Sequence, residues 1–343
     1  QDRVPTGTGL TSMRVVVIGA TGNVGTALLD ALATTPEVTA VLGVARRIPD
    51  GSGSPLGKLC WHAADIASDP LDFVADADAV VHLAWLIQPS RDEPQMRATN
   101  VTGTRRLVRA VVDHRVPTLV YASSVGAYAP APKSAPVPES WPVTGIRSST
   151  YSRHKAEVEA LLDETQAQDP TLRIVRMRTS LVFQRAAASE VHRLFLGPLV
   201  PWHLPRPLRL VPNIATLQFQ ATHASDIADA YVRALTRDVA GPFNVAAEPV
   251  LTPERIAGAV GGRVVPVPKS VLRAVVRASY AARLQPAEAG WLDMATKSPI
   301  MDCTRAHTLL DWHHTTSSIA ALTELLDGIS DGAGFPTPAL QPR

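Results

Sequence analysis

Short runs of apolar and β-branched residues alternate with longer stretches of helical periodicity along the first half of the chain. Six such runs are expected strands, at Arg14–Ile18, Val38–Val44, Trp61–Ala64, Ala79–Leu83, Thr118–Ala122 and Leu172–Met177. Helical patterning lies between them at Val24–Ala33, Met96–Arg115 and Ser152–Gln168. Continuous apolar strands separated by helices are typical of a parallel sheet that is covered on both faces. The pattern therefore predicts an α/β chain with a Rossmann-type, doubly wound parallel sheet.

The regular alternation ends near residue 180. The stretch Gly197–Pro212 holds five prolines, which interrupt helices and strands and suit a lid or a loop. Helical patterning returns at Ser225–Thr236, Pro253–Val260, Ser270–Ala282 and Thr316–Leu326. We expect residues 13–180 to form mainly the Rossmann domain. Residues 181–330 should form mainly a smaller substrate-binding region, with some segments returning to the Rossmann sheet. Residues 1–12 should be a disordered lead-in and residues 331–343 a loose tail.

Composition narrows the class of protein. Of 343 residues, 45% are hydrophobic and 19% charged, so the chain can bury a large core. The net charge of +2, from 33 basic and 31 acidic residues, gives no electrostatic case for binding nucleic acid or a membrane surface. Cys60 and Cys303 are too few for a disulfide framework or a four-cysteine zinc site, and no histidine has metal-ligand spacing, so no metal is expected. We expect a cytoplasmic protein whose partner is a small molecule.

A glycine-rich turn follows the first strand. Its residues are Gly19, Ala20, Thr21, Gly22, Asn23, Val24 and Gly25, and a helix comes next. Glycines at a strand-to-helix turn let the backbone approach a pyrophosphate, while the helix N-terminus supplies amide donors and partial positive charge. The spacing of three glycines is one residue wider than the usual dinucleotide fingerprint. This position after a strand predicts a dinucleotide site around Gly22–Val24.

The end of the second strand bears on which dinucleotide binds. An acidic side chain there accepts hydrogen bonds from the ribose 2′-hydroxyl of NAD, whereas an arginine meets the 2′-phosphate of NADP. Here Ala45 stands where the acid would be, and Arg46 and Arg47 follow. The two arginines could also be a solvated loop pair. The sequence favours NADP over NAD.

Candidate catalytic groups come from two segments. Tyr151 and Lys155 are four residues apart at the start of the expected helix, so the phenol and the ammonium share one face. A nearby positive charge lowers the pKa of a tyrosine toward working pH. Ser123 and Ser124 leave the fifth strand at its carboxyl end, where ligands bind in open α/β sheets. A serine there can hydrogen-bond a carbonyl oxygen that gains charge.

On these motifs the sequence resembles the extended short-chain dehydrogenase/reductase family, the NAD-dependent epimerases and dehydratases, from Met13 to about Asp327. The motifs that carry the resemblance are Gly19–Gly25, Asp65-Ile66, His82-Leu83-Ala84, Asn100–Thr104, Ser123-Ser124, Tyr151 with Lys155, His223–Asp226 and Asp302–Trp312.

The resemblance implies a role for each matching residue. Gly19, Gly22 and Gly25 would cradle the pyrophosphate, Asp65 and Ile66 would contact adenine, and Leu83 and Ala84 would line the cofactor cleft. Tyr151 would be the acid/base, Lys155 would hold the nicotinamide ribose and tune Tyr151, and Ser124 would bind the reacting oxygen. Asn100 and Asp226 would support the scaffold. Relatives also dimerise through two helices, here Met96–Arg115 and Ser152–Gln168, which implies a homodimer.

Three functions stay open. The leading one is an NAD(P)-dependent oxidoreductase that transfers hydride at a carbinol or carbonyl carbon. A sugar-nucleotide epimerase with tightly bound NAD is the second, although the chain lacks the Arg-Tyr-Phe-Asn stretch typical of such epimerases. The third is a non-catalytic regulator that senses dinucleotide, which the presence of both Tyr151 and Lys155 disfavours. Trp85, just past the fourth strand, could border the substrate pocket or fill core volume.

Overall fold

A computed structural model describes residues 12–49, 57–87, 91–196 and 209–342. Residues 1–11 of the expected lead-in and residues 197–208 of the proline-rich stretch lie outside the described residues, as does residue 343.

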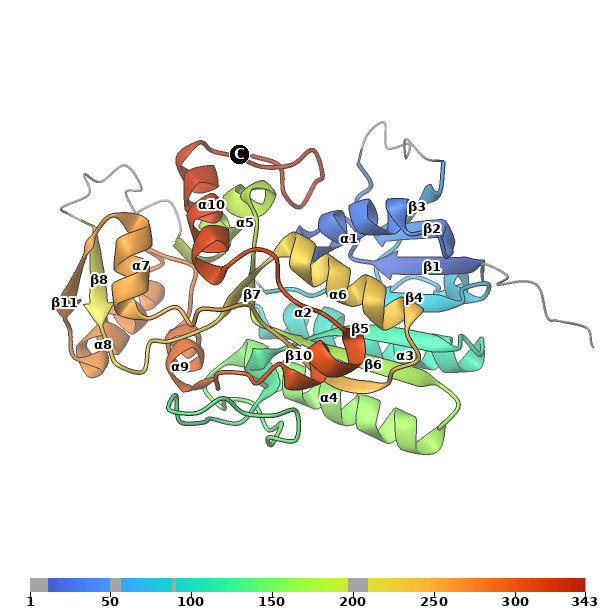
Figure 1. Cartoon of the computed structure of the whole chain (residues 1–343), viewed down its shortest axis with the longest axis horizontal. Coiled ribbons are helices and arrows are strands. Elements are labelled where there is room, and N and C mark those ends of the chain that lie inside the picture. Colours follow the sequence, from blue (N-terminus) through green and yellow to red (C-terminus); the bar gives the residue numbers. More distant parts are fainter. Residues whose placement is uncertain (1–11, 50–56, 88–90, 197–208, 343) are drawn as a thin grey trace, which may run out of the picture.

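Seven parallel strands form the central sheet, in the order β10-β6-β5-β4-β1-β2-β3 (Figure 1). Their bounds are β1 Met13–Ile18, β2 Val38–Ala45, β3 Leu59–Ala63, β4 Ala79–His82, β5 Thr118–Ser124, β6 Arg173–Thr179 and β10 Gly241–Val245. The expected Rossmann-type class is confirmed. The strand order reverses between β1 and β4, and in such sheets ligands bind beyond the carboxyl ends of the strands at this switch point.

Two hydrophobic cores cover the two faces of the sheet. Side chains of β1 alternate between them, so Val15 and Val17 join one core while Val16 and Ile18 join the other. Helices α1 (Asn23–Thr34) and α6 (Ala224–Thr236) pack on the first face, and α3 (Thr104–Asp113) and α4 (Thr150–Gln168) on the second. Burial of both faces explains why the strands read as continuous apolar runs.

The expected helix Met96–Arg115 is built in three pieces. Helix α2 (Glu93–Arg97) leads into a wider π-helical segment, Ala98–Gly103, and then into α3. A Cβ atom on Gly103 would lie 2.9 Å from a carbon of the Ile66 side chain, so the glycine allows the segment to approach the loop after β3 closely.

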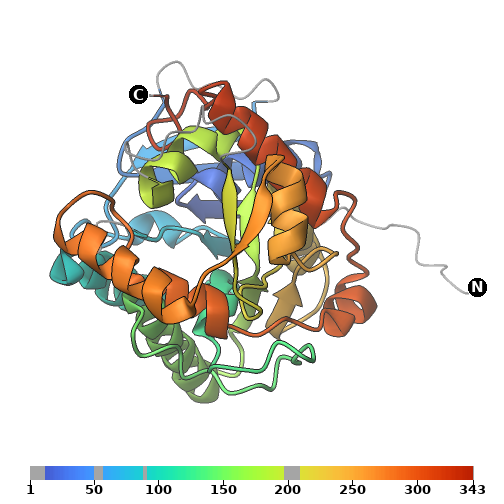
Figure 2. The same cartoon turned by 90° about the vertical axis from the view of Figure 1, so that its left-hand side faces the viewer.

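The second half of the chain builds a smaller region, at the left of Figure 1 and facing the viewer in Figure 2. It contains two two-stranded sheets, β7 (Leu181–Phe183) with β9 (Ala221–His223) and β8 (Leu210–Asn213) with β11 (Arg263–Pro266). Its helices are α5 Ala188–Val191, α7 Pro253–Val260, α8 Lys269–Ala281, α9 Ala289–Lys297 and α10 Ser318–Ser330. None of the helices that the structure describes is long and apolar enough to cross a membrane.

The segment after α10 differs from the expected loose tail. Leu340 is fully buried, and the Thr337 hydroxyl donates to the carbonyl of Thr21 at 2.8 Å. Inside the segment, the Phe335 amide donates to the Leu340 carbonyl and the Leu340 amide to the Thr337 carbonyl. Prolines and glycines here shape a compact loop with its own hydrogen bonds, a structure that apolar periodicity does not reveal.

A buried ionic cluster anchors α4 to the sheet. Glu159 of α4 is 1% exposed and accepts hydrogen bonds from Arg178 at 2.8 and 2.9 Å, from Arg176 at 3.2 Å and from the Ser123 hydroxyl. Burial raises the pKa of the Glu159 carboxyl, but the hydrogen bonds and charges of its partners outweigh this and hold the pKa below its usual range. Arg178 also donates to Tyr128 and to the Glu139 carbonyl.

We predict that Glu159→Gln destabilises the fold, because it leaves the buried Arg178 without its carboxylate partner and removes one of the two carboxylates that contact Arg176. Removing one partner of a buried ion pair costs about 3–5 kcal/mol, which should lower Tm by roughly 5–10 °C in a thermal melt. Because the folded pKa of Glu159 is depressed, its contribution is fully present above the unfolded pKa and is lost as pH falls through the folded value.

Asp163→Asn is the matched control for this prediction. Asp163 lies one turn further along α4 and also contacts Arg176, but its side chain is 65% exposed. Its loss should change stability by less than about 1 kcal/mol. Equal melting temperatures for Glu159→Gln and Asp163→Asn would contradict the assignment of Glu159 as the anchor.

Candidate active site

The glycine turn after β1 packs too tightly for any side chain at two of its positions. Gly19 has a φ of +86°, and a Cβ atom there would lie 2.7 Å from the Ala84 amide nitrogen. A Cβ atom on Gly25 would lie 2.4 Å from the Gly19 carbonyl oxygen. Helix α1 begins directly after Gly22, and its first turn holds no acidic residue. The positive end of the helix therefore remains available to an anion.

A cavity of about 570 Å³ opens at this turn, along the carboxyl ends of β1, β2 and β4. The candidate cofactor residues that line it are Gly19, Thr21, Gly22, Arg46, Arg47, Asp65, Ile66, Leu83 and Ala84. They come from four separate stretches of the chain. Their convergence on one cavity follows from the parallel sheet, which brings the carboxyl ends of its strands to one edge.

Three other candidate residues of the glycine turn do not line the cavity. Asn23 donates to the Val182 carbonyl and receives hydrogen bonds from Gln184, so it ties the turn to β7. Val24 packs against the first core, and Gly25 lies against the turn itself. Their contacts shape the turn and attach it to the second region.

Ser124 and Tyr151 meet beyond the end of β5. The Ser124 hydroxyl accepts from the Gly126 amide at 3.0 Å, and its interaction with the Tyr151 phenol acts to lower the pKa of Tyr151. Tyr151 lies in the first turn of α4, which Ser149 caps by accepting from the Ser152 amide. A Cβ atom on Gly126 would lie 2.9 Å from the Tyr151 ring, so the glycine lets the tyrosine lie flush against the loop. The two candidate groups of the sequence analysis are therefore neighbours.

Lys155 is on the same face of α4 but points to a different part of the site. Its ammonium donates to the Ala122 carbonyl and to the Tyr121 hydroxyl, and it lies 3.6 Å from the centre of the Trp85 ring. Its distance to the centre of the Tyr151 ring is 5.8 Å. Burial lowers the pKa of Lys155 well below its usual value, against an opposing effect of the Glu159 charge.

The pKa of Tyr151 differs from the expectation that the nearby Lys155 lowers it toward neutrality. Burial raises the pKa of Tyr151 to about 12, and only its interaction with Ser124 acts in the opposite direction. The physical reason is distance and desolvation, since the ammonium is directed at Ala122 and the phenol is removed from water.

Aromatic rings surround the phenol of Tyr151. Trp85 meets the Tyr151 ring edge-on at 5.9 Å, and Trp291 of α9 lies at 5.1 Å. Phe195 packs at right angles on Trp291 at 5.0 Å. Trp85 therefore borders the site, which was one of its two possible roles. Trp291 and Phe195 could not be predicted from the sequence, because no motif or periodicity marks them.

The contacts of Asn100 and Asp226 agree with the scaffold roles expected for these two polar residues. The Asn100 side chain exchanges two hydrogen bonds with the Leu86 backbone and so fixes the loop after β4. The Asp226 carboxylate accepts from Thr315 and Thr316, which fixes the approach to α10.

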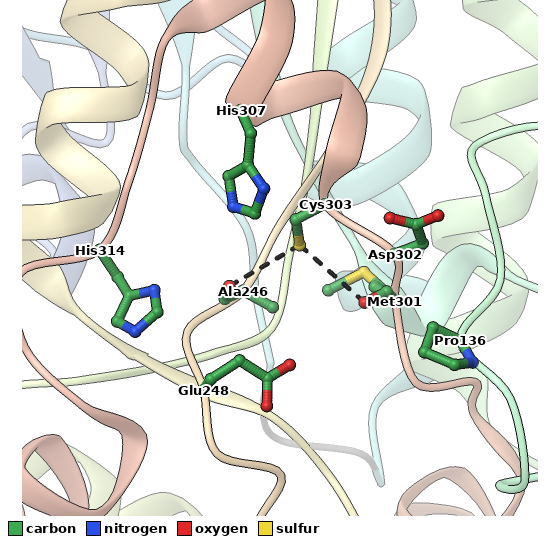
Figure 3. A pocket seen from close by; sticks show the side chains of 8 residues that line it. All are labelled: Pro136, Ala246, Glu248, Met301, Asp302, Cys303, His307 and His314. Carbon is green, nitrogen blue, oxygen red and sulfur yellow. Dashed lines mark hydrogen bonds between the residues drawn. The ribbon is translucent and has the colours of Figure 1, made fainter.

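A second cavity, of about 290 Å³, shares no lining residue with the first (Figure 3). Glu248, Asp302, His307 and His314 border it. Cys303 donates to the carbonyls of Ala246 and Met301, and burial raises the pKa of its thiol to about 12, so the sulfur is not a thiolate near neutral pH. Within the described parts of the chain, no group of three or more histidine, cysteine or acidic side chains could hold a metal ion.

The sheet and the glycine turn define an α/β protein of the Rossmann type. The sequence model of the NAD dependent epimerase/dehydratase family matches residues 15–246, and the chain belongs to this family.

Curated relatives share part of this sequence. An uncharacterized protein of Mycobacterium tuberculosis is 29% identical over 296 residues, which are 85% of this chain and 27% of that protein. The chain thus spans about a quarter of the length of the curated relatives it matches first. A second uncharacterized protein of the same organism is 25% identical over 96% of this chain and 86% of its own length. UDP-glucose 4-epimerase of Dictyostelium discoideum is 27% identical over 48% of this chain and 51% of its own.

Solved structures of the same fold include two 4-epimerases. UDP-glucuronic acid 4-epimerase from Bacillus cereus, in complex with NAD, aligns with a TM-score of 0.68 at 19% identity, over 93% of this chain and 99% of that one. UDP-glucose 4-epimerase from Thermotoga maritima, with UDP-glucose, aligns with a TM-score of 0.66 at 16% identity, over the same shares. At these identities the likeness establishes the fold.

Proposed function

We propose that the chain is an NAD(P)-dependent enzyme that transfers hydride at a carbinol or carbonyl carbon. The observation that carries the proposal is the proximity of Ser124 and Tyr151 on either side of Gly126, at the same sheet edge as the glycine-lined cavity. The cradle fits a dinucleotide, because Gly19 and Gly25 leave room only for backbone and the start of α1 faces the cavity. When bound, the nicotinamide supplies or accepts the hydride and, when oxidised, carries positive charge.

Tyr151 would pass a proton to or from the substrate oxygen. Its phenol has a pKa of about 12 in the structure, so it is protonated near neutral pH and ready to donate to a carbonyl oxygen. In the opposite direction, loss of the proton needs a nearby positive charge, which an oxidised nicotinamide provides. Ser124 would hold the same oxygen in line through its hydroxyl.

Lys155 would act on the cofactor side of the site. Lys155 is 3% exposed, and its ammonium is held by the Ala122 carbonyl, between Trp85 and Tyr121. From this position we propose that it binds the nicotinamide ribose. Its influence on Tyr151 would then pass through the cofactor rather than through direct contact.

The choice of dinucleotide rests on the end of β2. Arg46 and Arg47 are exposed side chains that line the cavity, and Ala45 presents no carboxylate to a ribose 2′-hydroxyl. This supports NADP as the tighter ligand. The solved structure from Bacillus cereus is a complex with NAD, which supports the alternative.

Sugar-nucleotide epimerisation is the second candidate function. It uses the same proton and hydride transfers but returns the hydride to the opposite face of the substrate, so the cofactor must stay bound. The similar structures of UDP-sugar 4-epimerases favour it. An ultraviolet spectrum of the purified protein distinguishes the two, because retained NAD indicates an epimerase and an empty site that NADPH titrates indicates a reductase. A non-catalytic dinucleotide sensor would need neither Tyr151 nor Ser124 in this arrangement.

We also propose a homodimer built on α3 and α4. Along α4, Ala156, Ala160 and Leu161 are exposed or half-buried, and such small or apolar residues allow the close approach of a second helix.

We predict that Tyr151→Phe lowers turnover by about 10²–10⁴-fold, because it removes only the proton-carrying hydroxyl. The dissociation constant of the cofactor should stay within about twofold, whereas Lys155→Met should weaken both turnover and cofactor binding. Turnover is measured from the absorbance of reduced nicotinamide in a screen of alcohols and carbonyl compounds. The dissociation constant of the cofactor is measured by calorimetry. Tyr280→Phe, a tyrosine on α8 outside the site, is the control and should keep full turnover. Wild-type turnover by Tyr151→Phe would exclude the hydroxyl as the acid/base.

We predict that Arg46→Gln weakens NADPH binding about tenfold and leaves NADH binding within about twofold. The loss of one charge-assisted contact to a 2′-phosphate, worth roughly 1.4 kcal/mol, explains the tenfold change. Calorimetric titration of both reduced dinucleotides measures it. An equal effect on NADH and NADPH would show that Arg46 does not contact the 2′-phosphate.

We predict twice the chain mass by light scattering at micromolar concentration. Ala160→Arg places a bulky charge on the proposed helix interface and should yield the monomer. As a control, Arg14→Ala, on an exposed ion pair with Asp76 outside both helices, should leave the dimer intact. A wild-type monomer refutes the proposal.

A further inference from the structure

The segment after α10 is a built structure that reaches the glycine turn. It starts at Ala333, whose amide donates to the Gly328 carbonyl and whose carbonyl accepts from the Ser189 hydroxyl. From there it forms the loop from Phe335 to Leu340, in which Leu340 is fully buried and Thr337 is 5% exposed. We call residues 333–341 the strap.

The strap lies directly on the turn that would cradle a pyrophosphate. The Thr337 hydroxyl donates to the Thr21 carbonyl at 2.8 Å, a buried bond between residues 316 positions apart. Pro338 and Ala339 line the same cavity as Gly19 and Gly22. The strap is therefore one wall of the candidate dinucleotide cavity.

Two arginines hold the strap from either side of the cavity. Arg193 donates to the Ala339 carbonyl at 2.8 Å and to the Gln341 carbonyl at 3.1 Å. From the end of β2, Arg47 approaches the Pro338 carbonyl at 3.5 Å. Arg47 and Arg193 also line the cavity, so the same guanidinium groups face both the strap and the space a dinucleotide would fill.

The composition of the strap suits closure over an anion. Residues 332–342 contain no charged side chain, so the strap brings no negative charge toward a pyrophosphate. Pro336 and Pro338 restrict the backbone, which reduces the conformational entropy lost when the strap is ordered. Ligand release would require the strap to leave the cavity, at the expense of the Thr337 bond and both Arg193 bonds.

We propose that the strap is a further part of the cofactor site, which closes over the pyrophosphate and adenosine end of the dinucleotide and sets how slowly it leaves. Arg193 and Thr337 are the residues that hold it shut. The inference rests on the dinucleotide site of the proposed function, and it adds residues that neither the glycine motif nor the catalytic motifs include.

The test compares dissociation rates of NADPH and NADH from the full chain and two point variants. A chain that ends before Gly332 loses the buried Leu340 and risks failing to fold, so point variants are used. Thr337→Val removes one hydroxyl at nearly constant volume, and Arg193→Gln removes the guanidinium clamp. Stopped-flow displacement, followed by the fluorescence of the reduced nicotinamide, should show dissociation about tenfold faster in Thr337→Val, which loses one hydrogen bond. It should be faster still in Arg193→Gln, which loses two.

Arg185→Gln is the matched control for Arg193→Gln. Arg185 precedes α5 and pairs with Asp331 at the base of the strap, but this ion pair is half exposed and outside the cavity. It should leave the dissociation rate unchanged. A strap that only stabilises the fold would lower Tm in Arg193→Gln without changing the rate.

Each alternative outcome overturns the proposal in a recognisable way. Wild-type rates in both Thr337→Val and Arg193→Gln would show that the strap does not retain the ligand. Tighter binding by either variant would show that the strap competes with the dinucleotide. If the wild-type chain binds neither NADPH nor NADH, the dinucleotide site itself is wrong, and this is visible before any variant is made.

Discussion

The carboxylate of Glu159 is the constraint on which the geometry of the candidate site depends. It lies one turn beyond Lys155 and two turns beyond Tyr151 on α4, and its partners Ser123, Arg176 and Arg178 belong to β5 and β6. A buried charge tolerates little displacement, because each lost contact leaves an unpaired ion in a low-dielectric interior. The cluster thereby fixes the rotation and depth of α4, and with them the meeting of Tyr151 and Ser124.

The parallel sheet is the second feature that determines the geometry of the candidate site. Strands β1, β2, β4 and β5 all end at the same edge. The glycine turn, the arginine pair and Leu83 with Ala84 follow the first three, and Ser124 is the last residue of β5. These groups come together because parallel strands place their carboxyl ends at one edge of the sheet. The second region then adds Trp291 and Phe195 above Tyr151.

Sequence patterns predicted an element correctly where the element depends on residues that are close together in the chain. The apolar runs predicted six strands of the central sheet, and glycine spacing predicted the turn, because both depend on neighbouring residues. Strand β10 was not predicted, because it begins with Gly241 and Pro242, a pair that is typical of a turn. Neither the position of Trp291 nor that of the strap was predicted, because both depend on packing between segments that are distant in the sequence. The direct effect of Lys155 on the Tyr151 pKa was misjudged, since four-residue spacing says which face a side chain shares but not where its ammonium points.

The hydrogen bond between Thr337 and Thr21 can form only late in biosynthesis, because Thr337 follows Thr21 by 316 residues. At about 5–20 residues per second, a ribosome adds the residues between them in roughly 15–60 s. Over that interval the early strands and the glycine turn can assemble while the cavity still lacks its last wall. A nucleotide that enters the nascent domain would therefore meet an open cleft, which the later segment then closes.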